Sequence, residues 1–379
     1  MAILRGFLGS KGRFVGVLGP AASKGNAYHL MEAVSGKKIS LIIPCRNEQG
    51  YIATCLNSIL NGDYPKELIE IILVDGESKD ATKDIIASYQ KEHDNIICLN
   101  NPKKTAPSAL NIGIKAAACE IIIRLDAHTA YSSNYLSKCV DYLTRYGASN
   151  VGGVIKTLPG NNTLLAKSFA LVLSHPFGVG PSFFRIGVTA VKVVDTVPFG
   201  CFRKEIFNEV GLFDENKPRN EDLDFNFRLR KAGKKIILVP EIISHYYARG
   251  NLKSFILHNF DNGYKVTDYL GTYGCIHSWR HFVPFFSVTC FLVLISLSFF
   301  SPLFAWMLLF LTVIYLLLCA AYSIKIAVRE KRSGLFVLLP VTFGILHASY
   351  GVGSLAGFST AIKRTWFAPP TLSVSGKEL

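Results

Sequence analysis

The chain has 379 residues, half of them hydrophobic, and its mean hydropathy of +0.30 is too high for an ordinary soluble protein and too low for one lying wholly in a membrane. A globular part joined to a membrane part explains both facts. The net charge of +14 is compatible with anionic lipid or phosphorylated substrates, and no nucleic-acid-binding motif is found, so nucleic acid is not an expected partner. Nine scattered cysteines without a C-x-x-C pair argue against a zinc site and for a reducing compartment.

The first half of the chain alternates between predicted strands and helices. Residues 1–37 are basic, with short apolar pieces, and form either a loose arm or a segment that touches a membrane. The ordered domain is expected over 38–250. Its first strands are expected at 39–44, 68–75, 96–99 and 120–125, with helices at 50–60, 80–89 and 106–118 between them. This rhythm predicts an α/β fold with a doubly wound parallel sheet and right-handed crossovers.

The middle of the chain is less regular. Strands are expected at 151–157, 197–204 and 235–240, with a helix at 164–173, and the glycine- and aromatic-rich segment 177–189 is expected to be a mobile loop near a site.

Two of the expected strands end in acids, Asp75 and Asp126. Parallel strands place both at the edge of the sheet where ligands bind in open α/β folds. His128 follows Asp126 by two residues and is expected on the same face, about 7 Å away. The two side chains could converge on one metal ion, or Asp126 could simply cap the next helix.

The sequence has neither a G-x-G-x-x-G nor a P-loop motif, so substrate phosphates would be held in another way. A divalent cation on Asp126 could do so, because Mg²⁺ or Mn²⁺ usually takes one or two carboxylates plus phosphate oxygens. Arg46, Lys103, Lys104 and Arg124 are candidates for direct pairing with phosphate, and solvated surface positions are the alternative for each.

A second group of acids, Glu221, Asp222 and Asp224, crowds the predicted start of a helix. Acids are favoured there by the helix dipole, so they could be caps only. Alternatively, Asp222 points into the cleft as a general base.

Five motifs occur together in the order and spacing of family 2 glycosyltransferases of the GT-A fold, which this chain resembles. They are Pro-Cys-Arg-Asn-Glu at 44–48, Val-Asp at 74–75, Ala-Leu-Asn-Ile-Gly at 109–113, Asp-Ala-His at 126–128 and Asn-Glu-Asp at 220–222. Together they span about residues 38–245. The chain is most similar to bacterial exopolysaccharide enzymes of the succinoglycan glucosyltransferase type, which share the Asp-Ala-His form and have C-terminal membrane helices.

The resemblance implies an inverting transfer from a nucleoside-diphosphate sugar. It implies that Asp222 deprotonates the acceptor hydroxyl and that Asp126, with His128, binds Mn²⁺ or Mg²⁺ at the diphosphate. The implied nucleotide-sugar-binding residues are Pro44, Arg46, Glu48, Asp75, Lys104, Asn111, Arg124 and Asp126. The implied acceptor-binding residues are Glu221, Arg249, Trp279 and Arg280.

Three departures from the family pattern bear on these roles. The sequence after the second strand is Asp75-Gly-Glu-Ser rather than Asp-Asp-Gly-Ser, so only Asp75 is carried over. His128 replaces the last acid of Asp-x-Asp and could bind the metal, bind phosphate, or leave Asp126 as the single protein ligand. The Trp279-Arg280 pair is reversed relative to the Arg-Trp pair of processive synthases, which favours transfer of a single sugar.

The C-terminal part is expected to lie in a membrane. Residues 282–324 contain no charged residue and are expected to form two transmembrane helices joined near Ser301-Pro302. Basic residues flank both outer ends, which places the catalytic domain on the cytoplasmic side of the cell's inner membrane. Residues 335–358 form a third transmembrane or re-entrant helix, and 251–281 an amphipathic interfacial linker.

The sequence therefore predicts a membrane-anchored inverting glycosyltransferase that moves a sugar from a nucleoside-diphosphate sugar to a lipid-linked, polyprenyl-diphosphate or polysaccharide acceptor. The alternatives are a non-catalytic membrane scaffold with a degenerate transferase domain, or another nucleotide-sugar enzyme.

Overall fold

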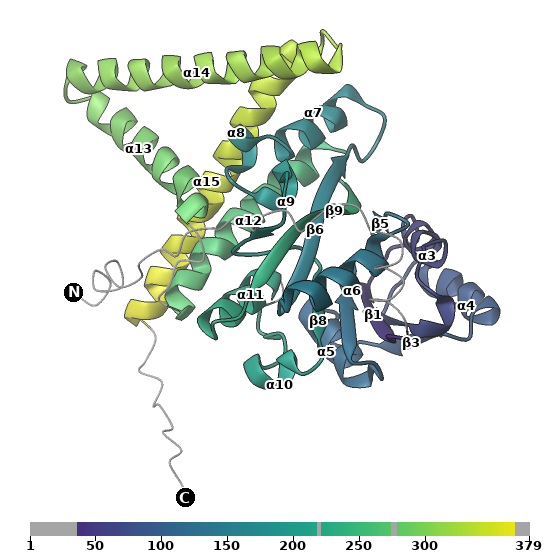
Figure 1. The fold of residues 1–379 in the computed structure, drawn as a ribbon. Helices are drawn as coiled ribbons and strands as arrows, with labels where there is room; N and C mark the ends of the chain where they lie inside the picture. The colour runs from purple at the N-terminus through teal and green to yellow at the C-terminus, as the bar shows by residue number, and fades with distance from the viewer. Residues whose placement is uncertain (1–35, 218–220, 274–278, 368–379) are drawn as a thin grey trace, which may run out of the picture. The chain divides into compact units, whose positions relative to one another are not determined.

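The computed structural model describes residues 36–217, 221–273 and 279–367, and its two compact units divide between Gly250 and Asn251 (Figure 1). Each unit is described by itself below. Residues 1–35 of the predicted N-terminal arm, and Asn220 of the Asn-Glu-Asp motif, lie outside the described residues.

The first unit is built on a nine-stranded sheet, whose first half is parallel. That half has the order β3-β2-β1-β4. The strands are β1 (Ile39–Cys45), β2 (Ile69–Asp75), β3 (Ile96–Asn100) and β4 (Ile121–Arg124). Side chains alternate between two cores: Ile121 and Ile123 face one, and Ile122 faces the other. Burial on both faces explains why these strands are continuous apolar runs.

Helices cover both faces of this sheet. The connecting helices are α3 (Ile52–Leu60), α4 (Thr82–Glu92), α5 (Ala106–Ala116) and α6 (Tyr135–Tyr146). Residues of α3 and α6 fill one core, and residues of α5, α10 (Ile206–Val210) and α11 (Glu221–Lys231) fill the other. The predicted α/β fold, with apolar helices after it, is confirmed.

The second half of the sheet is mixed. Antiparallel β8 (Cys201–Arg203) lies between β4 and β6 (Asn150–Leu158), and β6 pairs in parallel with β9 (Ile236–Tyr247). Two short strands, β5 (Thr129–Tyr131) and β7 (Lys192–Val193), each pair antiparallel with β9.

β9 runs well past the predicted end at residue 240. Its register against β6 shifts between Gly153 and Val154, so residues 240–242 bulge out of the pairing. A bulge accommodates Pro240, which has no N–H to donate to the ladder. The sequence therefore predicts that the strand ends at Pro240, whereas β9 continues beyond this residue.

The segment predicted as a loop at 177–189 contains two single-turn helices, α8 (Pro176–Val179) and α9 (Phe183–Ile186), after α7 (Leu164–Leu173). His175 caps the first of them, because its Nδ1 accepts a hydrogen bond from the N–H of Phe177 at 3.2 Å. Helices of four residues are too short to produce a periodic pattern in the sequence.

The second unit is helical. It contains α12 (Leu252–Tyr273), the 3₁₀ turn η2 (Trp279–His281), α13 (Phe282–Ser298), α14 (Pro302–Glu330) and α15 (Leu335–Phe367). Among the described residues, Pro302–Glu330 and Leu335–Lys363 are long and apolar enough to cross a membrane, judged by length and composition alone. The first predicted span corresponds to α13, which is apolar but has 17 residues.

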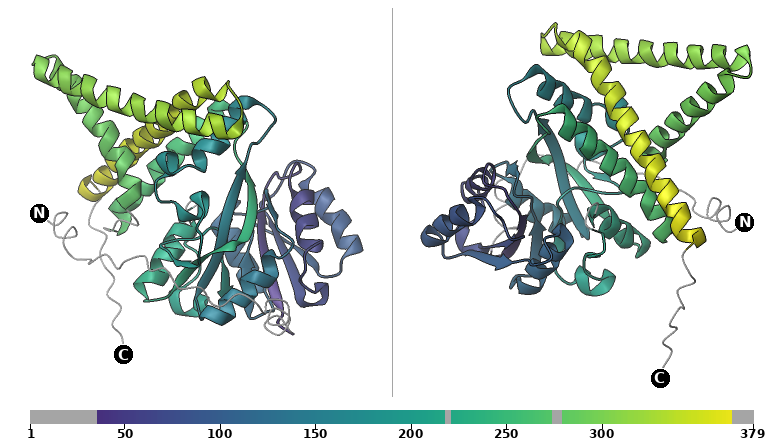
Figure 2. Two further views of the ribbon diagram at one scale, coloured as in Figure 1. Left: turned by 45° about the horizontal axis from the view of Figure 1, so that its top comes forward. Right: turned by 180° about the vertical axis from the view of Figure 1, so that it is seen from behind.

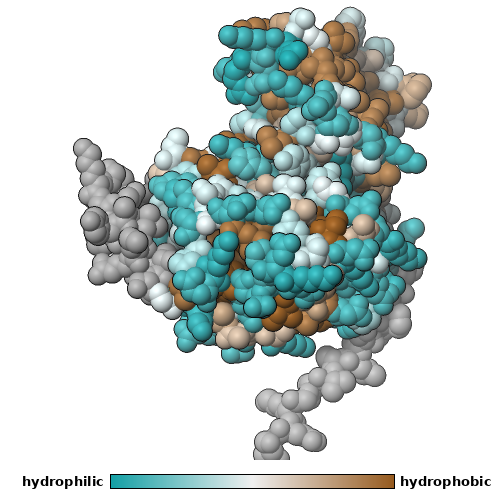
Figure 3. All heavy atoms as spheres, turned by 90° about the vertical axis from the view of Figure 1, so that its right-hand side faces the viewer, coloured by the Kyte–Doolittle hydropathy of each residue, from teal (hydrophilic) through white to brown (hydrophobic). Residues whose placement is uncertain are grey.

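Large hydrophobic side chains are exposed along α14, such as Trp306, Phe310 and Leu317. Figure 3 shows hydrophobic residues gathered over the C-terminal helices, in contrast to the mainly hydrophilic face around α3 and α4.

Helices α12 and α15 lie side by side along much of α12 (Figures 1 and 2). Glycines allow this close approach: a Cβ on Gly263 would lie 2.0 Å from the carbonyl oxygen of Tyr350, and a Cβ on Gly353 would lie 2.1 Å from that of Phe260. The hydroxyl of Thr267 donates a hydrogen bond to the carbonyl of Ser354 at 2.7 Å across the contact. The predicted amphipathic linker thus contains a long helix packed on a candidate membrane helix.

Candidate active site

The loops after β1 and β2 brace one another at the carboxyl edge of the sheet. The N–H of Asn47 donates to Ser78 Oγ at 2.9 Å, and Asn47 Oδ1 accepts from the N–H of Lys79 at 2.8 Å. The N–H of Glu48 donates to Thr82 Oγ1 at 2.7 Å. These contacts hold the segment that contains the predicted residues Pro44, Arg46 and Glu48.

Left-handed backbone conformations gather at the same edge. Asn47, Glu77 and Lys104 follow β1, β2 and β3 in turn and have φ values of 56°, 56° and 61°. Phe199, just before β8, has a φ of 64°. Such conformations cost about 1–3 kcal/mol for residues other than glycine, and they concentrate at functional sites.

Two predicted donor-binding residues are engaged in the fold itself. Asp75 is 1% exposed, and its carboxylate accepts a hydrogen bond from the N–H of Ser78 at 3.0 Å and lies 3.4 Å from Lys83 Nζ. The amide of Asn111 donates to the carbonyl of Phe213 and accepts from its N–H, at 2.9 and 3.0 Å. Asp75 therefore shapes its own turn, and Asn111 ties α5 to the segment before α11.

Arg124 lies at the centre of the acids. Its Nη2 lies 3.1 Å from Asp126 Oδ1 and 2.8 Å from Glu221 Oε1, and its Nη1 donates to Asp222 Oδ2. The arginine is 6% exposed. The end of β4 and the start of α11 are thus brought together, so the carboxylates of Asp126 and Asp222 bind the same guanidinium.

The carboxyl of Asp222 has an unusual proton affinity. Burial, followed by the charges of Glu221 and Asp126, raises its pKa to about 8, although Arg124 and the N–H of Phe199 act in the opposite direction. A general base works best when its pKa lies near the working pH. The raised pKa is compatible with the role predicted for Asp222, which stays a prediction.

The first turn of α11 is anchored by aromatic packing and ion pairs. Phe225 is 1% exposed and packs against Phe202 and Phe213, with ring centroids 5.4 and 4.7 Å away. Asp224 accepts from Lys217 and, at 3.0 Å, from Arg228. Asp224 is therefore bound within the protein, while Asp222 keeps 23% of its side chain exposed.

His128 and Asp126 have different partners. The Nδ1 of His128 lies 3.4 Å from Glu48 Oε1, whereas Asp126 pairs with Arg124. Burial opposes protonation of His128, but the hydrogen bond to Glu48 and the charge of Asp126 outweigh it and raise its pKa. In the part of the chain that the structure describes, no group of three or more His, Cys, Asp or Glu side chains is arranged to hold a metal ion.

The residues present nevertheless suit a cation held mainly by substrate. Three acidic side chains share the single charge of Arg124, and the carboxylates of Asp126 and Glu221 alone leave an excess of negative charge at the end of β4. Asp126 keeps 23% of its side chain exposed. A site with one protein carboxylate, completed by phosphate oxygens and water, is common for Mg²⁺.

The remaining predicted residues surround these groups or belong to the other unit. Arg46 is exposed, and its stem covers Gly76, where a Cβ would lie 3.2 Å from Arg46 Cδ. Lys104 pairs with Glu77 at 2.5 Å. Arg249 is exposed and near enough to oppose the protonation of His128. Trp279 and Arg280 are in η2 of the second unit.

Three residues near the site are not among the site residues predicted from the sequence. Phe199 contacts Asp222 through its backbone N–H, and Arg185 lies over the ring of Tyr246, 5.7 Å from the centroid. The ring of Tyr246 lies 5.8 Å from that of His128. Arg185 and Tyr246 are brought to this place by an irregular segment and by the unpredicted extension of β9.

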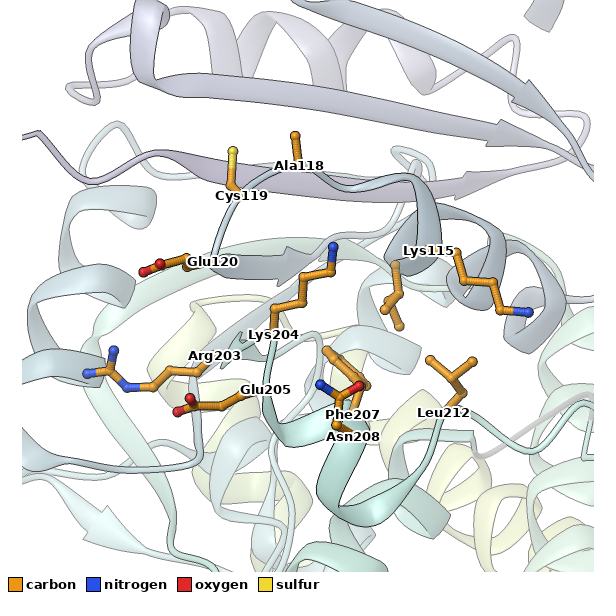
Figure 4. Close-up of a pocket in the computed structure, with 11 residues that line it drawn as sticks. Lys115, Ala118, Cys119, Glu120, Arg203, Lys204, Glu205, Phe207, Asn208 and Leu212 are labelled. Atoms are coloured by element: carbon orange, nitrogen blue, oxygen red, sulfur yellow. The ribbon is translucent and has the colours of Figure 1, made fainter.

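A cavity of about 580 Å³ is located at the opposite edge of the sheet (Figure 4). Its lining includes Glu120, just before β4, Lys204, just after β8, and the apolar side chains of Phe207 and Leu212. It contains none of the predicted site residues.

Comparison with known proteins finds similar proteins for the first unit. The family model described as Glycosyl transferase family 2 matches residues 40–211. The dolichyl N-acetyl-alpha-D-glucosaminyl phosphate 3-beta-D-2,3-diacetamido-2,3-dideoxy-beta-D-glucuronosyltransferase of Methanococcus voltae is 34% identical over 233 residues, which cover 59% of this chain and 71% of that protein. Succinoglycan biosynthesis protein ExoA of Rhizobium meliloti is 28% identical over 225 residues, covering 59% and 67%. A solved structure, S. aureus TarS 1-349 in complex with UDP-GlcNAc, aligns with a TM-score of 0.44 at 17% identity over 65% of this chain and 72% of that one.

Proposed function

Because this chain belongs to the family 2 glycosyltransferases, we propose that it is a membrane-anchored inverting enzyme that transfers a sugar from a nucleoside-diphosphate sugar to a lipid-linked or polysaccharide acceptor in cell-surface polysaccharide synthesis. The observation that best supports this proposal is the contact of Arg124 with both Asp126 and Asp222. A donor-binding acid and a candidate base that contact the same side chain are close enough to act on the donor and the acceptor of one transfer reaction.

In this mechanism, Asp222 is the general base. Its carboxylate takes the proton from the acceptor hydroxyl as that oxygen bonds to the anomeric carbon and the bond to the nucleoside diphosphate breaks. Inversion requires the base on the face of the sugar opposite the leaving group. Arg124 orients the Asp222 carboxylate, and Glu221, which shares the same guanidinium, helps to orient the acceptor.

Donor binding falls to the loops at the sheet edge. Asp75, Arg46 and the segment 44–48 would contact the nucleoside, and Asp126, with His128 as a possible second ligand, would hold Mn²⁺ or Mg²⁺ at the diphosphate. When bound, such a cation neutralises the charge that develops on the leaving diphosphate.

The acceptor and the location are inferred from relatives and from the second unit. The Methanococcus voltae protein is named for transfer to a dolichyl-phosphate-linked sugar, and the Rhizobium meliloti protein for succinoglycan biosynthesis. Two candidate membrane helices support attachment to the bilayer that carries a lipid-linked acceptor. The basic residues Lys325, Arg329, Lys331 and Arg332 favour a cytoplasmic position for the loop between α14 and α15, and for the catalytic unit.

A donor screen with the purified full-length chain tests this proposal. Release of nucleoside diphosphate from a panel of sugar nucleotides is measured with extracted lipid-linked intermediates, with Mn²⁺ or Mg²⁺ and with a chelator. We expect release with at least one donor, dependent on acceptor, and a product with inverted anomeric configuration by NMR. A product of retained configuration, or no release with any donor, would contradict the proposal.

A further inference from the structure

Arg185 is a cation in an apolar environment without an acid beside it. It is in α9, where its guanidinium lies over the rings of Phe184 and Tyr246, 5.5 and 5.7 Å from their centroids. Its Nη1 is inaccessible to solvent and has no hydrogen-bond partner. Among the described residues, no hydrogen bond or ion pair involves the Arg185 side chain.

Arg185 lacks the carboxylate partners that Arg124 has. Both arginines have buried guanidinium nitrogens, but Arg124 binds three carboxylates and Arg185 binds none. Burying a charge without a partner is costly, and contact with aromatic faces returns only part of that cost. Desolvation also lowers the pKa of Arg185, as expected for a cation short of negative charge.

Arg185 is connected to the candidate site through the ring of Tyr246. Tyr246 is a neighbour of both Arg185 and His128: its ring centroid lies 5.7 Å from the Arg185 guanidinium and 5.8 Å from the ring centroid of His128. Tyr246 is paired in the sheet with Thr129, three residues after Asp126. Arg249 is also close to His128. Cationic groups are therefore found around Tyr246, where Glu48 pairs with His128, whereas the other acids of the site contact Arg124.

We propose that Arg185 binds an anionic oxygen group of the substrate: either the phosphate next to the first sugar of a lipid-linked acceptor or the carboxylate of an acidic donor sugar. This inference rests on the proposed function and adds the charge that the substrate must carry. The planar guanidinium suits both groups, because its paired N–H donors match two oxygens of a phosphate or a carboxylate. A purely structural arginine would affect the fold but would not distinguish charged from neutral ligands.

The test compares charged probes with matched neutral ones, using the full-length chain in detergent. Equilibrium affinities are measured for farnesyl phosphate and farnesol, and for UDP-glucuronate and UDP-glucose. The variants are Arg185→Gln, Arg185→Lys and the control Arg203→Gln. Arg203 likewise has no ion pair among the described residues but lines the cavity at the opposite edge of the sheet.

We expect Arg185→Gln to lower the affinity for one anionic probe about 10- to 100-fold, because a charge-assisted hydrogen-bond pair is lost. The affinity for the matched neutral probe should not change. Arg185→Lys should show a smaller loss of this affinity, and Arg203→Gln should show none. A loss with farnesyl phosphate identifies the acceptor phosphate as the source, and a loss with UDP-glucuronate identifies the donor carboxylate.

Two results would overturn the inference: wild-type protein that binds neither anionic probe more tightly than its neutral partner, or an Arg185→Gln variant that binds all four probes as wild type does. If Arg185→Gln does not fold, the same criterion applies to Arg185→Lys. Nucleotide release is measured in parallel. If nucleotide is released but the Arg185 variants bind the probes as wild type does, this inference alone is wrong. If no sugar nucleotide releases its nucleotide, the proposed function is wrong.

Discussion

Arg124 Nη2 lies 3.1 Å from the carboxylate of Asp126, and Nη1 of the same side chain donates to Asp222, which lies 98 residues further along the chain. One side chain therefore links the strand end that would face the donor to the helix start that would face the acceptor. Changes to either acid should be felt by the other, because they share one counter-charge.

Replacing Asp222 with asparagine should remove transfer but not donor binding. The amide cannot accept the proton of the acceptor hydroxyl, so turnover should fall about 10²- to 10⁴-fold, the usual contribution of a general base. Donor affinity, measured by calorimetry, should stay within about threefold of wild type, because the asparagine Oδ1 can still accept a hydrogen bond from Arg124 and Asp126 is unchanged. Asp84→Asn, on the exposed face of α4, is the matched control. Normal turnover in Asp222→Asn would rule out this role.

The pH dependence of kcat/KM should reflect the raised pKa of Asp222. The base must be ionised to act, and burial beside Glu221 and Asp126 raises its pKa to about 8. At lower pH a growing share of Asp222 is protonated, so log kcat/KM should rise with a slope of about one as pH approaches 8 and then level off. A flat profile between pH 6 and 9 would show that no group with this pKa limits the reaction.

Removing the guanidinium of Arg124 should destabilise the fold. Arg124→Met leaves three carboxylates close together without a counter-charge, and breaking a buried ion pair costs about 3–5 kcal/mol. The acids keep 11 to 23% of their side chains exposed, so a loss at the lower end is expected. For a unit of this size, Tm should fall by about 6–12 °C. Combining Arg124→Met with Asp222→Asn should restore part of the stability, and a fully additive loss would show that the two residues are not coupled.

Asp126→Ala should abolish the part of donor affinity that depends on a divalent cation. Calorimetry with Mn²⁺ and with a chelator separates that part from the rest. In His128→Ala a smaller effect is expected, because His128 is paired with Glu48 rather than with Asp126. Equal donor affinity for wild type and Asp126→Ala under both conditions would refute the assignment.

The close contact between α12 and α15 should be sensitive to single methyl groups. A Cβ at Gly353 would lie 2.1 Å from a backbone oxygen of α12, so Gly353→Ala should destabilise the second unit by about 1–3 kcal/mol. Gly344, on the same helix, has nothing within 4 Å of such a Cβ. Gly344→Ala should therefore leave the Tm of the detergent-solubilised protein unchanged or slightly higher, because alanine is the better helix former. Equal Tm values for the two variants would contradict the packing described.

Local sequence patterns were sufficient to place the parallel strands and the start of α11. Asp75 and Asp126 end or follow buried apolar runs, and Asp222 lies in the first helical turn that its acidic neighbours indicate. These features depend on residues a few positions apart. The α/β class followed from the alternation of such segments.

Contacts between distant segments could not be read from the sequence. The sequence predicts Arg124 as a phosphate ligand, because nothing local shows that α11 brings Glu221 and Asp222 to it. Arg185 lies in a segment expected to be a loop near a site, but nothing in the sequence pairs it with Tyr246, because α9 has only four residues and Tyr246 lies beyond the proline where β9 is expected to end. Both arginines contact residues that are distant in the sequence, and only the folded sheet brings these residues together.

The glycine-lined contact between α12 and α15 also fixes an order of assembly during synthesis. Thr267 emerges from the ribosome 87 residues before Ser354, the residue it bonds to. At about 5–20 residues per second, that delay is roughly 4–17 seconds. During this interval α15, the helix against which α12 packs, has not yet been synthesised, so the apolar side of α12 must be covered by other contacts until α15 follows.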